Sequence, residues 1–441
     1  MSISPSEPCW IIGVLDAGPS ALSHEAERLL SQAELVLADE RFLTLFQPLF
    51  LPEAEQRIFP GHFKELPGWI TAAQAEGKRV VVLASGDPLF SGVAGHLHRR
   101  LPAGSFRVLP APSLAQLAFA RLALPWTNAR LLSVHSGDGG DWSADAPANH
   151  PLIPLCRALL SSDLLAVLTS PANGPQRIAR LLLALQMGDS FRLTVAERLS
   201  SPEERLLRDL SAAEVAAGDF NHPNLLILQR NSAPPVAQPL LGLSDSQLCD
   251  PQQSGLITKR EIRVLALANL ALQPQHILWD IGAGTGSVGL EAARLLSQGW
   301  VYAIEKDPHR CDTIRRNRAA LGVFNHQVQC GTAPTFLEQW PAPNAIFIGG
   351  SGGQLAPLIQ LAASRLQPAG RLVITLVTLE TLSPCLEQLQ QQGFAWTLSQ
   401  IAISHSRPIR QQHRLLPDNP VWMITAWQNA PPFSPHPYET R

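Results

Sequence analysis

The sequence predicts two α/β domains in one chain, and three observations support this fold class. The chain has 441 residues, more than a single hydrophobic core usually serves. Short apolar runs alternate with helix-like segments in both halves, which is typical of sheets with parallel strands. A stretch rich in Pro, Ser and Gln divides the halves at residues 231–254. We therefore predict a first domain over 1–232, a linker over 233–254, a second domain over 255–430 and a disordered tail over 431–441.

The strands are expected where the apolar runs lie. In the first half these are Trp10–Val14, Val80–Ala84, Arg107–Leu109, Leu131–Val134, Leu164–Leu168, Phe191–Val195 and Leu225–Leu228. In the second half they are His276–Asp280, Trp300–Glu305, His326–Cys330, Ala345–Ile348, Arg371–Leu376, Phe394–Ile403 and Val421–Trp427. The last two runs are expected to pair as an antiparallel edge.

The composition narrows the range of possible partners and sites. The formal net charge of −2 lacks the basic excess of a phosphate-binding surface, so we expect no nucleic-acid partner. There is no basic leader and no apolar run of about 18 residues, so we expect a cytoplasmic protein without a membrane partner. The six cysteines contain no C-x-x-C pair. Buried thiols are therefore expected, with neither a metal site nor a disulfide framework.

A glycine-rich turn marks the clearest ligand site in the second half. A strand, a glycine-rich turn and a helix N-terminus together bind nucleotide-like ligands, and glycine permits close approach of the backbone. Glu305 ends the next strand, where a carboxylate can accept hydrogen bonds from ribose hydroxyls. Gly331, Thr332 and Ala333 follow the third strand and are expected to border an adenine ring. The candidate residues in the turn itself are Asp280, Gly282, Ala283, Gly284, Thr285 and Gly286.

Two ligands fit this turn. Gly284, Gly286 and Gly289 match the G-x-G-x-x-G pattern of dinucleotide sites, which is weak evidence alone. Asp280 precedes these glycines, and a carboxylate there suits a cationic amino-acid ligand and repels a pyrophosphate. We therefore favour S-adenosylmethionine. A tight turn without a ligand explains one or two glycines, but not the acid, the three glycines and Glu305 together.

The segment before this unit opens an apolar helix. Thr258 and Glu261 match a capping box, T-x-x-E. Lys259 and Arg260 are not what a helix dipole favours in a first turn, so they are also candidates for facing a substrate carboxylate. We take Lys259, Arg260 and Glu261 as candidate catalytic residues and Thr258 as a candidate cofactor contact.

The first half carries tight turns in place of a glycine fingerprint. Val80–Ala84 leads into Gly86, Asp87 and Pro88, and Ser113 closes a similar turn after another strand. By physics alone these are only turns. Several of them at strand ends would line one cleft between two subdomains, so these four residues are candidate cofactor contacts.

Substrate contacts are expected at three positions. Gly349 and Gly350 follow the fourth strand of the second half, in a loop that suits a large flat substrate lying against backbone. A flexible connection is the alternative there. His135 follows a strand of the first half, although a lone histidine is more often structural.

These motifs resemble known families. The first half resembles the class III tetrapyrrole methyltransferases of corrin synthesis, through SGDPLFSGVAG at 85–95, LPAPS at 109–113 and TVAERLSSPEER at 194–205. The second half resembles the class I decarboxylating methyltransferases of that pathway, through LITKREIR at 256–263 and LWDIGAGTGSVGLEAA at 278–293. The order of the two modules is similar to that of the fused precorrin-6Y methyltransferases.

The resemblance implies a fold and a reaction. It implies an N-terminal class III domain of two α/β subdomains and a C-terminal Rossmann-like class I domain. It also implies methylation of a precorrin ring at C5 and C15 and loss of carbon dioxide from the acetate on C12, in cobalamin biosynthesis. S-adenosylmethionine would bind once in each domain. The tetrapyrrole carboxylates would need cationic partners, for which we consider Lys259, Arg260, His405 and Arg407, and we expect a homo-oligomer.

Other functions stay open on the residues alone. They are a methyltransferase for RNA or protein, a dinucleotide-dependent oxidoreductase and a non-catalytic sensor of S-adenosylmethionine. Three residues also depart from the family pattern: Leu15 replaces a glycine, Asn344 an aspartate and Thr375 an asparagine. Each replacement would weaken a contact with cofactor or substrate.

Overall fold

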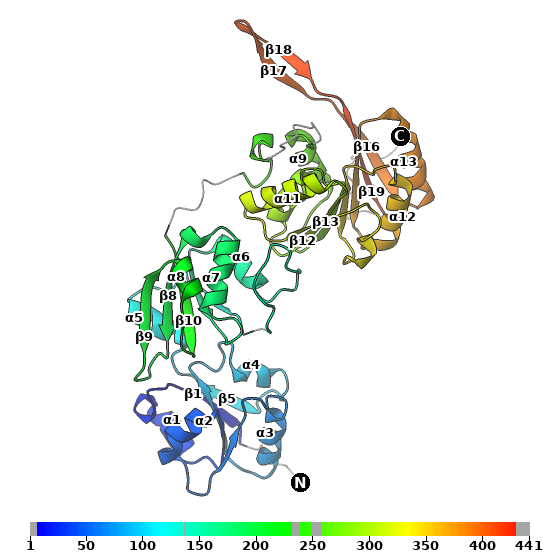
Figure 1. The fold of residues 1–441 in the computed structure, drawn as a ribbon. Coiled ribbons are helices and arrows are strands. Elements are labelled where there is room, and N and C mark those ends of the chain that lie inside the picture. The colour runs from blue at the N-terminus through cyan, green and yellow to red at the C-terminus, as the bar shows by residue number, and fades with distance from the viewer. Residues whose placement is uncertain (1–6, 136, 232–238, 249–256, 429–441) are drawn as a thin grey trace. The chain divides into compact units, whose positions relative to one another are not determined.

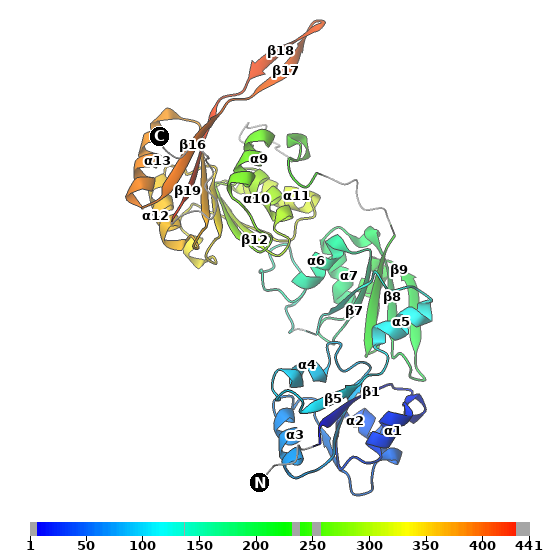
Figure 2. The same cartoon turned by 180° about the vertical axis from the view of Figure 1, so that it is seen from behind.

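The computed structural model describes residues 7–135, 137–231, 239–248 and 257–428. The chain divides into two compact units, shown from two sides in Figures 1 and 2. Within the described residues, no helix has the length and apolar character needed to cross a membrane. Unit 1 comprises Met1–Trp142, Pro154–Leu183 and Met187–Ser232, and unit 2 comprises Ser143–Ile153, Ala184–Gln186 and Ala233–Arg441.

The first sheet of unit 1 is parallel, with the strand order β3-β2-β4-β1-β5. Alternate strand residues face opposite sides, so each face has its own core. Helices α1 (His24–Leu30) and α2 (Glu40–Phe46) cover one core, and α3 (Leu66–Ala75) and α4 (Val93–His98) cover the other. The strands are β1 (Cys9–Val14), β2 (Leu35–Ala38), β3 (Glu55–Ile58), β4 (Val80–Ser85) and β5 (Phe106–Leu109).

The second sheet of unit 1 has the order β6-β7-β10-β8-β9. Strands β6 and β7 are parallel, and the other pairs are antiparallel. The prediction of a parallel sheet was therefore wrong for three of these four pairs. For β8 and β9 the reason is that the link 198–204 is too short for a helical crossover. The elements are β6 (Arg130–Ser133), β7 (Leu164–Leu168), β8 (Phe191–Glu197), β9 (Arg205–Leu210), β10 (Asn224–Arg230), α5 (Leu114–Leu122), α6 (Ile153–Ser161), α7 (Pro175–Ala184) and α8 (Ala212–Ala217).

Unit 2 contains a seven-stranded sheet in the order β13-β12-β11-β14-β15-β19-β16. The first five strands are parallel, and β19 pairs antiparallel with β15 and β16, as predicted for the last two apolar runs. The chain order reverses beside β11, and ligands of open α/β sheets bind at such a switch point. The strands are β11 (Ile277–Ile281), β12 (Trp300–Glu305), β13 (His326–Cys330), β14 (Ala345–Ile348), β15 (Arg371–Leu376), β16 (Ala395–Ile401) and β19 (Val421–Trp427).

Helices cover both faces of this sheet. Figures 1 and 2 show α9 (Arg260–Asn269), α10 (Ser287–Leu295) and α11 (Pro308–Ala320) on one side, with α12 (Leu355–Arg365) and α13 (Leu379–Gln391) on the other. A two-stranded hairpin, β17 (Ser404–Ile409) and β18 (Gln412–Pro417), extends from the end of β16 (Figure 1).

Part of the segment predicted as a linker packs on unit 2. Leu243 is fully buried, and the Gly242 N–H donates to the Glu291 carboxylate on α10. The other linker residues, 233–238 and 249–254, and the predicted tail, 431–441, lie outside the described residues.

A buried ion network holds this segment in place. Arg263 on α9 is fully buried, and its Nε donates to Glu291 Oε2 at 2.7 Å. Its Nη1 donates to Asp245 Oδ1 at 3.0 Å and to the Thr258 carbonyl at 2.7 Å. Because Glu291 is also fully buried, each charge depends on the other for compensation.

Replacing Arg263 with methionine (Arg263→Met) is expected to lower the free energy of unfolding of unit 2 by about 3–5 kcal/mol, because Glu291 would be left buried and unpaired. Urea unfolding followed by tryptophan fluorescence measures this loss. The double variant Arg263→Met with Glu291→Leu should recover much of it, since no buried charge remains. A single variant as stable as the wild type would contradict the importance of this ion pair.

Candidate cofactor and substrate sites

The turn after β11 lies against two neighbouring strand ends. The N–H groups of Gly282 and Ala283 donate to the Ile304 carbonyl at 3.0 and 3.1 Å. Gly282 has a φ of 70°, and a Cβ there would lie 2.2 Å from the Gly350 carbonyl oxygen. Only glycine fits this close approach of two loops.

Glu305 connects the turn to the next loop. Its Oε2 accepts the Gly284 N–H at 2.8 Å, and its Oε1 accepts the Asp307 N–H at 3.1 Å. Its backbone carbonyl accepts the Gly331 N–H at 2.9 Å. The ends of β11, β12 and β13 are thus joined through one residue, which is 4% exposed.

These loops enclose a cavity of about 250 Å³. Eight of the residues that we predicted line it: Gly282, Gly284, Glu305, Gly331, Thr332, Ala333, Gly349 and Gly350. The prediction missed five further lining residues, which are Ile304, Lys306, Arg310, Ser351 and Gly352. Of these, Lys306 could have been found from the sequence, because it directly follows Glu305 at the end of the strand.

Asp280 lies behind the turn and does not line the cavity. It is 1% exposed, and its Oδ2 accepts the Gly289 N–H at 2.9 Å. Its Oδ1 has no hydrogen-bond partner among the described residues. Burial raises the pKa of Asp280 to about 7; the Gly289 hydrogen bond opposes this and the charge of Glu305 adds to it. Asp280 therefore supports the turn from inside.

Three other turn residues also stand outside the lining. Gly286 caps α10 with a φ of 78°, a left-handed conformation that suits glycine. The Thr285 carbonyl accepts the Asn317 side-chain amide at 3.0 Å, and the Ala283 N–H is bonded to β12 as described above. These residues shape the loop that their neighbours line.

The segment Thr258–Glu261 lies apart from this cavity. Helix α9 begins at Arg260 with Lys259 as its N-cap and no side-chain cap. The predicted capping box of Thr258 and Glu261 was therefore wrong, because the first helical bond runs from the Arg263 N–H to the Lys259 carbonyl and makes Lys259, not Thr258, the N-cap. None of these four residues lines the cavity, and neither do His405 and Arg407 on β17. Their roles stay predictions.

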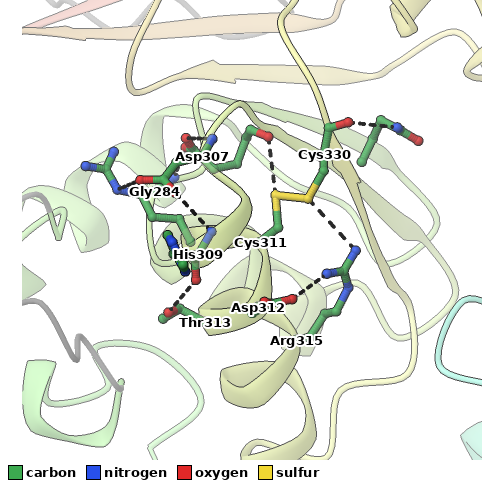
Figure 3. The surroundings of a disulfide bond; sticks show 11 residues. Gly284, Asp307, His309, Cys311, Asp312, Thr313, Arg315 and Cys330 are labelled. Atoms are coloured by element: carbon green, nitrogen blue, oxygen red, sulfur yellow. Dashed lines mark hydrogen bonds and ion pairs between the residues drawn. A yellow bond between two sulfur atoms is a disulfide. The ribbon is translucent and has the colours of Figure 1, made fainter.

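A disulfide joins Cys311 and Cys330 (Figure 3). The expectation of free thiols was wrong for this pair, because packing of α11 beside β13 brings their Cα atoms to 6.0 Å. The Cys311 Sγ lies 3.3 Å from the Glu305 carbonyl oxygen, so the disulfide borders the cavity loops. Cys9, Cys156 and Cys385 are buried free thiols, and Cys249 lies outside the described residues.

Unit 1 has a larger cavity of about 670 Å³. Turns at strand ends meet beside it, as predicted. The Gly86 N–H donates to the Val14 carbonyl at 2.9 Å, and the Ala111 N–H donates to the Gly86 carbonyl at 3.3 Å. A Cβ on Gly13 would lie 2.1 Å from that same Gly86 oxygen, so glycine at 13 permits the turns to meet.

Of the predicted contacts, Asp87, Ser113 and His135 line this cavity, while Gly86 and Pro88 do not. Burial lowers the pKa of His135, and nearby His222 adds to this effect. The sequence prediction missed several lining residues, both aromatic and polar. They include Arg41, Phe42, Phe59, Phe63, Phe90, His96, Thr169, His222 and Asn224.

The three departures from the family pattern lie outside both cavity linings. Asn344 directly precedes β14, at the end of the strand opposite Gly349, and its Oδ1 accepts the Ile277 N–H at 2.8 Å. The Thr375 hydroxyl lies 3.5 Å from the Ile348 carbonyl. The Leu15 carbonyl accepts the Gly18 N–H at 3.1 Å. All three make contacts within the fold.

Comparison with known proteins decides the family. Residues 8–214 match the tetrapyrrole (corrin/porphyrin) methylases, and residues 252–428 match the precorrin methyltransferase domain. The chain is 34% identical to a precorrin-6Y C(5,15)-methyltransferase [decarboxylating] from a Sinorhizobium species, over 96% of this chain and 98% of that protein. The chain belongs to this methyltransferase family. The predicted fold class, a class III domain followed by a second methyltransferase domain, is confirmed, and the enzyme uses S-adenosylmethionine.

Two further relatives are similar to part of this chain. A probable cobalt-precorrin-6B C(15)-methyltransferase (decarboxylating) from Pyrobaculum aerophilum is 37% identical over 39% of this chain and 88% of that protein. A crystal structure of precorrin-6Y C5,15-methyltransferase from Geobacter metallireducens is 34% identical and covers 44% of this chain and 98% of that chain, with a TM-score of 0.42.

Gly282→Ala is expected to weaken binding of S-adenosylhomocysteine at least tenfold in unit 2, because the added Cβ must displace the Gly350 loop. Titration calorimetry on the full chain measures the dissociation constant, and tenfold corresponds to about 1.4 kcal/mol. Gly322→Ala is the control, since Gly322 also has a positive φ but nothing lies within 4 Å of its Cβ position. Equal affinity in Gly282→Ala and the wild type would refute the expectation.

Asp280 is expected to make stability depend on pH. Its pKa is raised from 3.8 to about 7 in the folded chain, so between these values the folded state holds a proton that the unfolded state has lost. Stability therefore falls as pH rises from about 4 to about 7, by an amount on the order of 4 kcal/mol. Asp280→Asn should lack this fall. Urea unfolding of both proteins at about pH 4 and about pH 8 measures their free energies of unfolding. An equal change with pH in the wild type and in Asp280→Asn would contradict the expectation.

Proposed function

We propose that this enzyme methylates a precorrin ring at C5 and C15 and removes the carboxyl group of the C12 acetate as carbon dioxide. The observation that supports this is the presence of two cavities in one chain, one in each unit, both at strand ends. The relative that matches 96% of the chain is named for both methylations and for the decarboxylation. We further propose a cytoplasmic homo-oligomer that binds no nucleic acid, consistent with the net charge of −2.

The cavity of unit 2 fits a methyl donor. When bound, S-adenosylmethionine supplies a methyl group on a positively charged sulfur, which is an activated leaving group. Gly282 and Gly284 leave room for close approach to backbone, and Gly331–Ala333 border the same space. The Glu305 oxygens each accept one backbone N–H. Each oxygen therefore retains a lone pair that can accept a hydrogen bond from a ribose hydroxyl.

We propose the second donor site in unit 1. Its cavity of about 670 Å³ has more than twice the volume of the other, which suits a donor together with part of a ring. Four phenylalanines line it and offer apolar surface to a conjugated macrocycle. Arg41 lines the same cavity and pairs with Asp16 at 3.2 Å, and its charge suits a ring carboxylate.

The reaction requires the chain mainly to align the reacting atoms. A bridging carbon of a reduced tetrapyrrole is enamine-like and can attack the methyl group directly. The chain then has to hold the carbon, methyl and sulfur in line and exclude water. Decarboxylation needs an electron sink, which the conjugated imines of the ring can supply. We assign C5 methylation to unit 1, and C15 methylation with decarboxylation to unit 2.

Separate variants of the full chain test this assignment. Wild-type enzyme with precorrin-6B and S-adenosylmethionine should yield a product with two added methyl groups and one lost carboxyl group by mass spectrometry. Gly282→Ala should lose carbon dioxide release and one methylation. His135→Trp, which fills the unit 1 cavity from an exposed position, should lose the other methylation and keep carbon dioxide release. Loss of the same product in both variants would overturn the assignment.

A further inference from the structure

The cavity of unit 2 carries a cation that the proposed donor site does not use. We propose that Lys306 binds a carboxylate of the substrate and thereby selects polycarboxylate rings. The proposal rests on the proposed function, because it takes a tetrapyrrole as the substrate of this unit.

Lys306 stands at the rim of the cavity. It follows Glu305 at the end of β12, is exposed and lines the cavity. Its Nζ lies 3.9 Å from the position that a Cβ on Gly352 would occupy. The ammonium group therefore extends toward the glycine-rich loop after β14, on the side where Gly349 and Gly350 line the same space.

The charges around Lys306 leave it available. The Glu305 carboxylate is 4% exposed and accepts the backbone N–H groups of Gly284 and Asp307. Arg310, the other cation in the lining, lies 3.6 Å from the Asp307 carboxylate. Within the described ranges of the chain, no ion pair forms with Lys306. Its ammonium group can therefore bind an incoming anion without first breaking an ion pair.

Size places the substrate at this rim. A cavity of about 250 Å³ suits the methyl donor, so a larger ring has to lie at the mouth against the loop of Gly349–Gly352. An ammonium is a compact charge with three donors, which suits one carboxylate at such a position. Lys259 and Arg260, the cations that the sequence favoured, do not line this cavity.

The test compares substrate and donor affinity in the full chain. Lys306→Gln should raise KM for precorrin-6B about tenfold or more, while the dissociation constant of S-adenosylhomocysteine changes less than twofold. Lys306→Arg should restore most of the loss, because the charge returns. Arg316→Gln removes a charge from an exposed position of α11, the helix that follows Lys306, outside the lining, and should leave both constants unchanged. Added salt should raise KM more in the wild type than in Lys306→Gln.

Two results would overturn the proposal. An unchanged KM in Lys306→Gln would show that no carboxylate binds there, and an equal weakening of S-adenosylhomocysteine would place Lys306 in the donor site. Failure of the proposed function has a different signature. Wild-type enzyme would then bind S-adenosylhomocysteine but not convert precorrin-6B, and the assignment of a tetrapyrrole substrate would fall together with the role of Lys306.

Discussion

The site in unit 2 depends on one buried carboxylate that holds two loops together. Glu305 accepts the N–H of Gly284 in the turn after β11 and the N–H of Asp307 before α11. The close approach of Gly282 to Gly350 joins the loop after β14 to the same place. A neutral apolar side chain at 305 would leave two N–H groups without their acceptor, and each such loss is costly in a buried setting. The positions of the lining residues follow from these contacts.

The two units build their cavities by different means. In unit 2 the cavity lies at the switch point of a single sheet, and backbone and small side chains dominate its lining. In unit 1 the lining combines residues that follow strands of a parallel sheet with residues that follow strands of a mixed one. Four phenylalanines are among its lining residues. If each unit binds a methyl donor, as we propose, one donor chemistry is served by a backbone-lined site and by a side-chain-lined site, since both need mainly shape and alignment.

The sequence predicted the buried strands well, because their apolar runs are bounded by turns. The predicted bounds of β7, β12, β13, β14, β15 and β19 agree with the structure. It missed β2, which has four residues, and β3, β9, β17 and β18, which are half-buried or exposed and whose pairing is visible only in space. Missing β2 also hid Arg41, which follows it. Lys306 was not selected from the sequence, although it directly follows Glu305 and lines the cavity. A separation of 19 residues gave no sign that Cys311 and Cys330 meet.

Each cavity is lined by residues of one unit alone. Asn224 is the last lining residue of the unit 1 cavity along the chain, and Gly282 is the first of the unit 2 cavity. The short segments of unit 2 that lie within the first half, 143–153 and 184–186, line neither cavity. A division of the coding sequence between Asn224 and Gly282 would therefore leave both linings whole. The Pyrobaculum aerophilum relative, which corresponds to 39% of this chain over 88% of its own length, has the size expected of such a separate gene product.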